Sequence, residues 1–164
     1  MSVKVSDKDM DWKRIKRELG VMANSYTKVG LQQGSKHKDP ESGEMSDLVT
    51  IGAVHEFGTK RTPQRSWLRT AFDKNKGSIT RVKGKVFGEV LNGRISPIAG
   101  LRLVGEFFES KVKANIVSIK TPPNSPATQR AKASKVRSKK VTEINNPLID
   151  TGQMLQSVRH VEVM

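Results

Sequence analysis

A histidine and a glutamate stand side by side at His55 and Glu56 and are the first candidates for chemistry. A zinc-dependent protease places two histidines four residues apart on one helical face, with a glutamate between them as general base. Position 59 is Thr59, and neither His37 nor His160 stands at metal-ligand spacing from His55. The pair is therefore predicted to be structural, with no metal bound.

The glutamate of this pair is expected to fix the turn that follows it. Its predicted ion-pair partner is one of three nearby basic residues: Lys60, Arg61 or Arg65. Gly58 permits a backbone conformation that other residues resist, and Pro63 fixes the next bend. Beyond the bend, the chain is expected to return to the core through three apolar residues: Trp67, Leu68 and Phe72.

Other motifs of catalysis are absent from the sequence. There is no cysteine, which excludes disulfides, thiolate metal sites and a cysteine nucleophile. The G-x-S-x-G, Walker and G-x-G-x-x-G patterns do not occur. We therefore predict no catalytic residue, no cofactor and no metal, and a protein that is not an enzyme.

The chain is strongly basic, with a net charge of +14 over 164 residues. No acid occurs from 110 to 142, and one stretch, RAKASKVRSKK, holds six cations: Arg130, Lys132, Lys135, Arg137, Lys139 and Lys140. Such charge favours a polyanion or an acidic protein as partner. The stretch has no aromatic residue for base stacking, so a solvated or protein-contacting arm is favoured. A basic nucleic-acid-binding module remains the alternative.

Local patterns place the elements of the first half. Apolar residues at three- and four-residue steps predict a helix after Asp9 or Asp11 that ends at 24–25, and alternation over 26–34 predicts a strand. Turn-forming residues predict a mobile loop over 34–46. The segment 46–58 fits a helix or a strand; the helix is favoured because Ser46 and Gly58 stand where caps belong.

The second half is predicted to contain the central core helix. One helix should reach about Leu91, and Ser96 and Pro97 then have the residue types of a cap and a first turn. The helix that follows carries a long apolar stripe that includes Phe108, with further apolar residues beside it. We expect it to pack on two sides, with Phe108 in the core.

The last third is predicted to be mostly extended. In the Pro-rich and then basic segment 121–146, Ser125 and Pro126 could start a short helix, but most of the segment should form an extended arm. Asp150 or Thr151 can cap one short helix, and the alternating end RHVEVM predicts a final strand. The sum is a single α+β domain over 1–164, a small antiparallel sheet with helices packed on one face and long extended loops.

No run approaches the roughly 18 apolar residues that a membrane span needs. The N-terminal stretch MSVKVSDKDMDWKRIKREL also lacks the apolar core of a signal peptide. We expect a soluble, non-secreted protein with no membrane partner.

Three segments together resemble one family. IGAVHEFGTKRTPQRSWLRTAF resembles the pattern A-x-x-H-E-F-G … I-P-x-R-P-F-L-R of the small tail-completion and head–tail joining proteins of tailed bacteriophages. TPPNSPATQRAK is similar to their P-L-S-P-A-T-x-x-R-K, and NNPLIDTGQMLQSV to their K-P-L-I-D-T-G-x-L-x-x-S-I. The chain departs from the pattern at three places: Thr62 replaces an apolar residue before Pro63, Ser66 and Trp67 replace Pro-Phe, and Asn146 stands where the family has Lys. The Mu-type morphogenesis proteins and the lambdoid-type tail components share the pattern, so both branches stay open.

The resemblance implies a non-catalytic virion protein that forms a ring, six-fold in the family, at the neck or tail end and joins tail to head. Implied partners are further copies of the chain, the tail terminator and the head connector, with DNA passing through the ring. Implied locations are the virion neck and, during assembly, the host cytoplasm. Structural corner residues would be His55, Glu56, Phe57, Gly58, Pro63, Arg65, Trp67, Asp150, Thr151 and Gly152. The six cations of the basic stretch would contact neighbouring proteins or DNA.

Overall fold

The computed structural model describes residues 10–38, 43, 45–137 and 145–164. Its elements in chain order are α1 (Met10–Ala23), β1 (Tyr26–Leu31), β2 (Lys36–Lys38), β3 (Met45–Asp47), α2 (Leu48–Phe57), α3 (Leu68–Leu91), α4 (Pro97–Ser118), α5 (Pro126–Arg137), α6 (Gln153–Ser157) and β4 (Val158–Val163). The predicted α+β class is confirmed.

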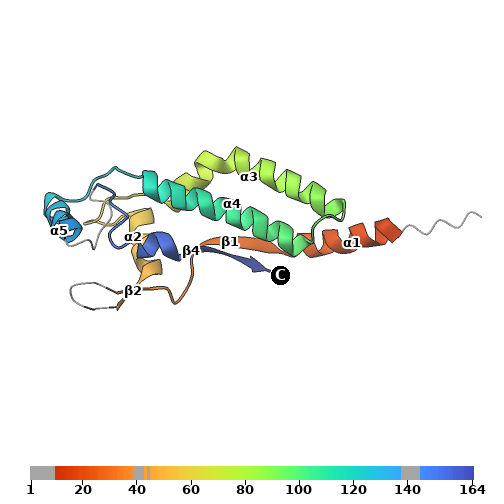
Figure 1. Ribbon diagram of the computed structural model, residues 1–164, viewed down its shortest axis with the longest axis horizontal. Helices are drawn as coiled ribbons and strands as arrows, with labels where there is room; N and C mark the ends of the chain where they lie inside the picture. Colours follow the sequence, from red (N-terminus) through yellow and green to blue (C-terminus); the bar gives the residue numbers. More distant parts are fainter. Residues whose placement is uncertain (1–9, 39–42, 44, 138–144) are drawn as a thin grey trace, which may run out of the picture.

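The molecule is elongated around a helical hairpin. α3 and α4 run side by side along its length, and α1 extends beyond the end at which their turn lies (Figure 1). β1 pairs antiparallel with β4, with Tyr26 opposite Val163 and Leu31 opposite Val158. α4 covers both strands and approaches closely at Gly105, where an added Cβ would lie 2.8 Å from Thr27 Oγ1.

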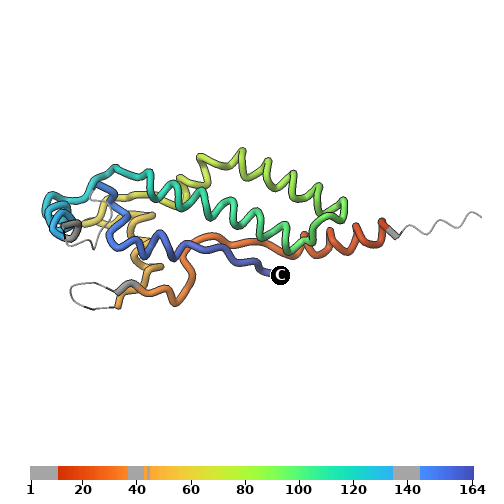
Figure 2. Tube along the Cα trace, viewed as in Figure 1, coloured from red at the N-terminus to blue at the C-terminus, as the bar shows by residue number. Residues whose placement is uncertain are grey.

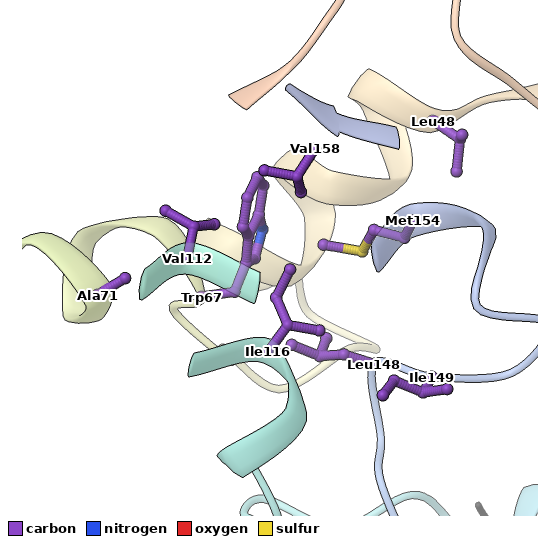
Figure 3. Packing of buried hydrophobic residues seen from close by; sticks show 9 residues of the cluster. All are labelled: Leu48, Trp67, Ala71, Val112, Ile116, Leu148, Ile149, Met154 and Val158. Carbon is purple, nitrogen blue, oxygen red and sulfur yellow. The ribbon is translucent and has the colours of Figure 1, made fainter. Parts of the chain in front are cut away.

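The main core lies at the other end of the hairpin, where α3 begins and α4 ends. Segments distant in sequence meet there, as the trace in Figure 2 shows. Its buried members are Leu48, Trp67, Ala71, Val112, Ile116, Leu148, Ile149, Met154 and Val158, with Trp67 at the centre (Figure 3). Because they come from α2, α3, α4, α6 and β4, this core joins most of the chain into one unit.

Local signals placed most helices correctly. The helix interpretation of 46–58 is confirmed, with Gly58 at its C-terminus and a φ of 74°. Its N-cap is Asp47 rather than Ser46; the Asp47 carboxylate accepts from the backbone N–H of Val49 and of Thr50. Ser96 accepts from the N–H of Ala99 at 3.2 Å, so the predicted start of α4 is also confirmed.

Parts of the two segments expected to be irregular have regular secondary structure. Residues 36–38 and 45–47, at the ends of the predicted loop 34–46, pair as the strands β2 and β3. Within the predicted extended arm 121–146, residues 126–137 form α5, whose first turn is capped by Ser125 Oγ accepting from the N–H of Thr128. Residues 39–42, 44 and 138–144 lie outside the described part of the chain.

The apolar stripes are less covered than predicted. Phe108 is half-buried and meets Phe72 edge to face, with ring centroids 5.9 Å apart. Phe72 itself is 44% exposed, so its predicted return to the core was wrong. Leu103 and Val117, expected to pack a second side of α4, are also exposed.

α1 is tied to the hairpin through one arginine. Arg14 donates from Nη2 to the carbonyl of Leu91 at 2.9 Å and so satisfies an acceptor at the C-terminus of α3. It also pairs with Glu18 on its own helix at 2.9 Å. The apolar stripe of α1 stays partly open, with Trp12 51% exposed. Among the described residues, no helix combines the length and apolar character required to cross a bilayer.

Candidate functional site

Buried polar side chains gather where α2, α3, α4 and α5 end or begin. Five such residues are buried in the described part of the chain: Glu56, Arg65, Asn115, Lys132 and Asn146. We refer to these five residues as the polar joint. Each of them hydrogen-bonds to the backbone of a segment distant in sequence, which is what a buried polar group requires.

Glu56 caps the start of α3. Its carboxylate accepts from the backbone N–H of Leu68 at 2.8 Å and of Arg69 at 3.1 Å, and from Ser66 Oγ at 2.6 Å. The helix has no cap from its own N-cap residue, Trp67. A carboxylate at a helix N-terminus satisfies orphan N–H groups and meets the positive end of the helix dipole.

The predicted ion-pair partners of Glu56 were therefore wrong. The basic side chain nearest to it is Arg69, whose Nε lies 4.0 Å from Oε1. Arg65, one of the three residues expected to pair with it, turns away and binds backbone carbonyls instead. Glu56 still fixes the turn into α3, but it does so by accepting backbone N–H groups.

Arg65 holds the Pro-rich connection that follows α4. Its guanidinium donates from Nε to the carbonyl of Pro122 at 2.7 Å and from Nη2 to the carbonyl of Pro123 at 2.9 Å. Its backbone N–H donates to the carbonyl of His55 at 2.7 Å. Burial lowers the pKa of Arg65 from its ordinary value. One arginine thus joins the end of α2 to the segment before α5.

His55 lies beside this arginine and is kept neutral. Its Nδ1 is 3.4 Å from Arg65 Nη1. Burial lowers the pKa of His55, and the positive charges of Arg65 and Lys132 lower it further. Protonation would add a third positive charge to this region, so the neutral imidazole is the stable form at neutral pH.

Lys132 and Asn146 connect α5, the end of α4 and the segment before α6. Lys132 Nζ donates to the carbonyls of Asn146 at 2.7 Å and Ile149 at 2.5 Å. Asn146 Nδ2 donates to the carbonyls of Ile116 and Val117, both at 2.9 Å, and so satisfies the last turn of α4. Its Oδ1 accepts from the N–H of Leu148 and Ile149.

Two further bonds complete the connections. Asn115 Nδ2 donates to the carbonyl of Trp67 at 2.8 Å, which joins α4 to the start of α3. Trp67 Nε1 donates to the carbonyl of Gly52 at 2.9 Å, which joins that point to α2. With these bonds, the polar joint links α2, the start of α3, the end of α4, α5 and the segment before α6.

The three motif segments meet at a cavity of about 300 Å³ next to the polar joint. The first motif contributes Ile51 and His55, and the second contributes Asn124, Thr128, Ala131 and Lys132. The third contributes Pro147, Leu148, Asp150, Thr151, Gly152, Gln153 and Met154. Segments separated by some seventy residues in the sequence therefore share one corner of the fold.

The remaining residues that were predicted to form structural corners lie in turns or beside them. Gly58 lies so close to Gln64 that an added Cβ would be 3.0 Å from its backbone nitrogen, and Phe57 beside it is 66% exposed. Pro63 is exposed in the same turn. Gly152 has a φ of 79° before α6, and Thr151 Oγ1 accepts from the N–H of Gln153 at 3.4 Å. These contacts shape the backbone.

The basic stretch does not form one accessible surface. Arg130 is exposed on α5, whereas Lys132 is 4% exposed and is bonded inside the protein, so as it stands it cannot meet a partner. Lys135 and Arg137 belong to α5, but their side chains lie outside the described part of the chain, as do residues Lys139 and Lys140 entirely.

Sequence reasoning missed Asn115 and the roles of Asn146 and Lys132. The one available signal was that Asn146 departs from the family pattern, and an asparagine before Pro147 gave no indication of its four backbone partners.

Within the described ranges, no group of three His, Cys, Asp or Glu residues is arranged to hold a metal ion. The hydrogen bonds of the polar joint connect backbone segments to one another, which is a structural role.

Comparison with models of protein families, with curated proteins and with solved structures finds no match for this chain.

Proposed function

We propose that this chain is a structural virion protein that forms a ring at the neck or tail end of a tailed bacteriophage and joins tail to head. The observation that carries the proposal is the meeting of the three motif segments at one corner. Motifs that resemble the same family, in the same order, are expected to serve one structural unit, and here they surround the polar joint.

The surface supports an assembly role. Large apolar side chains are exposed at many positions among the described residues, including Trp12, Phe57 and Leu103. Single exposed apolar residues are ordinary, but the partly open stripe of α1 brings Trp12 and Leu19 onto one face of that helix. Subunits that bury different patches against each other form heterologous contacts. Such contacts give a closed ring when the rotations between successive subunits add up to one full turn.

The mechanism of such a protein is geometric. The polar joint fixes the angles between α2, α3, α4 and α5 before assembly, because each of its bonds ties one element to another. A pre-shaped subunit loses less conformational entropy when it docks than a disordered one does. The expected partners are further copies of the chain, the tail terminator and the head connector, and no reaction is catalysed.

Mass and morphology test this proposal. Sedimentation velocity and electron microscopy of the purified protein should show a closed ring, and six copies of the 18.2 kDa chain would weigh about 109 kDa. A phage that encodes the chain and carries a stop codon in its gene should accumulate separate heads and tails. Normal yields of joined particles from that mutant would refute the proposal.

A further inference from the structure

The outward face of α3 carries a run of positive charge in its middle part. Between Asp73 and Glu89 the helix has no Asp or Glu. Five exposed cations lie within this interval. Lys74 donates to Asn115 Oδ1 at 3.4 Å, and we refer to the other four as the α3 cation face: Lys76, Arg81, Lys83 and Lys85. In the part of the chain that the structure describes, none of the four is in an ion pair. Their charge is therefore available to a partner.

Helical geometry arranges the four cations in two rows. At 100° per residue, Lys76 and Lys83 fall on one flank, about 10.5 Å apart along the axis. Arg81 and Lys85 fall on the other flank, about 6 Å apart. The ridge between the rows consists of small residues, and a Cβ added at Gly77 or Gly84 would meet nothing within 4 Å.

We propose that the α3 cation face binds the phosphate backbone of double-stranded DNA. The major groove is about 12 Å wide and admits a helix, so the small ridge can enter it while the two rows face the phosphates on either side. The 24 residues of α3 span roughly 36 Å, about one turn of the duplex. Glycine has no side chain with which to contact a base edge, so this binding is independent of the DNA sequence.

The composition of this face favours DNA over an acidic protein. Protein interfaces are depleted in Lys and are anchored by buried aromatic or other large apolar groups. Between Lys76 and Lys85 the ridge has no such anchor. The exposed Phe87 lies just beyond and lines an apolar groove among α3, α4 and β1 that Lys83 also lines. The lack of aromatic groups on the ridge also favours a duplex over a single strand, whose bases need stacking partners.

The salt dependence of DNA binding provides the test. Fluorescence anisotropy with a labelled 24-base-pair duplex measures the binding constant at several salt concentrations. For four phosphate contacts, the logarithm of the binding constant should fall with the logarithm of the salt concentration with a slope of about −3.6. Affinity should then fall on the order of a hundredfold between 50 and 200 mM salt. In the triple variant Lys76→Glu, Arg81→Glu, Lys85→Glu, the slope should become shallower by about 2.7, and affinity should fall at least tenfold more than in a matched control.

The control carries the same change of net charge on another exposed helix face, with Lys13→Glu, Lys16→Glu and Arg17→Glu on α1. Circular dichroism and thermal unfolding establish that both variants are folded. If the reversal variant is not folded, Lys76→Gln, Arg81→Gln, Lys85→Gln replaces it, with the same expected change of slope.

Equal losses of affinity in the two triple variants would overturn the proposal, because net charge alone would then explain the binding. Tighter binding of poly-L-glutamate than of the duplex would also overturn it, in favour of an acidic protein partner. Oligomeric mass measured on the same samples separates this inference from the proposed function. A ring without DNA affinity refutes only the DNA contact, and DNA affinity without a ring refutes only the ring.

Discussion

The carboxylate of Glu56 caps a helix that begins twelve residues later, accepting the backbone N–H of Leu68 at 2.8 Å. This contact sets the direction in which α3 leaves the end of α2. Because α3 and α4 form the long axis of the molecule, a bond at the polar joint determines the position of surfaces far from it (Figure 1).

Replacing Glu56 should therefore destabilise the whole fold. Glu56→Ala leaves two N–H groups at the start of α3 without an acceptor and should lower the free energy of unfolding by about 2–3 kcal/mol. Urea unfolding followed by circular dichroism measures it. Glu106→Gln, on an exposed position of α4, should change stability by less than about 0.5 kcal/mol. Similar effects of the two substitutions would contradict the capping role.

Asn146 and its exposed neighbour Asn145 form a matched pair. Asn146 is 0% exposed and bonds to four backbone groups, so Asn146→Ala should cost about 3 kcal/mol. Asn145→Ala should be nearly neutral. Thermal unfolding of both variants measures the difference, and equal melting temperatures would show that the Asn146 bonds contribute little.

Glycines on α3 and α4 should respond in opposite directions to alanine. Gly105→Ala places a Cβ 2.8 Å from Thr27 Oγ1 and from His160 Cδ2, so α4 must move away from the sheet, at a cost of about 1–3 kcal/mol. Gly84→Ala meets nothing within 4 Å and should stabilise α3 by about 0.5–1 kcal/mol. Chemical denaturation measures the change in the free energy of unfolding for both variants. A stabilising Gly105→Ala would mean that the sheet and α4 lie further apart than the structure shows.

Replacing the half-buried Phe108 should lower the free energy of unfolding by less than replacing a fully buried phenylalanine. Full burial would give about 3–5 kcal/mol for Phe108→Ala, and partial burial should reduce this to about 2 kcal/mol. A double-mutant cycle with Phe72→Ala should show a coupling of about 0.5–1.5 kcal/mol from the edge-to-face contact. Additive single effects would indicate that the rings do not interact.

The lowered pKa of His55 makes stability depend on pH. The unfolded chain binds a proton at His55 near pH 6.5, whereas the folded chain binds it only at lower pH. Stability should therefore fall as pH decreases below about 6.5, until the folded pKa is reached. In His55→Gln this part of the decrease should vanish. Urea unfolding at pH 7.5 and 5.5 measures it, and parallel profiles would exclude a role for His55.

The sequence by itself determined the helices that local signals define. These signals act within one or two helical turns, so they can be read from the linear sequence. They are the apolar stripe before Leu91, the Ser96–Pro97 start of α4 and Gly58 at the end of α2. The tertiary structure alone decided the partners of Glu56, Lys132 and Asn146. Those partners are mostly backbone N–H and C=O groups, which every non-proline residue possesses, so no residue type marks them in the sequence. Long-range packing alone brings them within bonding distance.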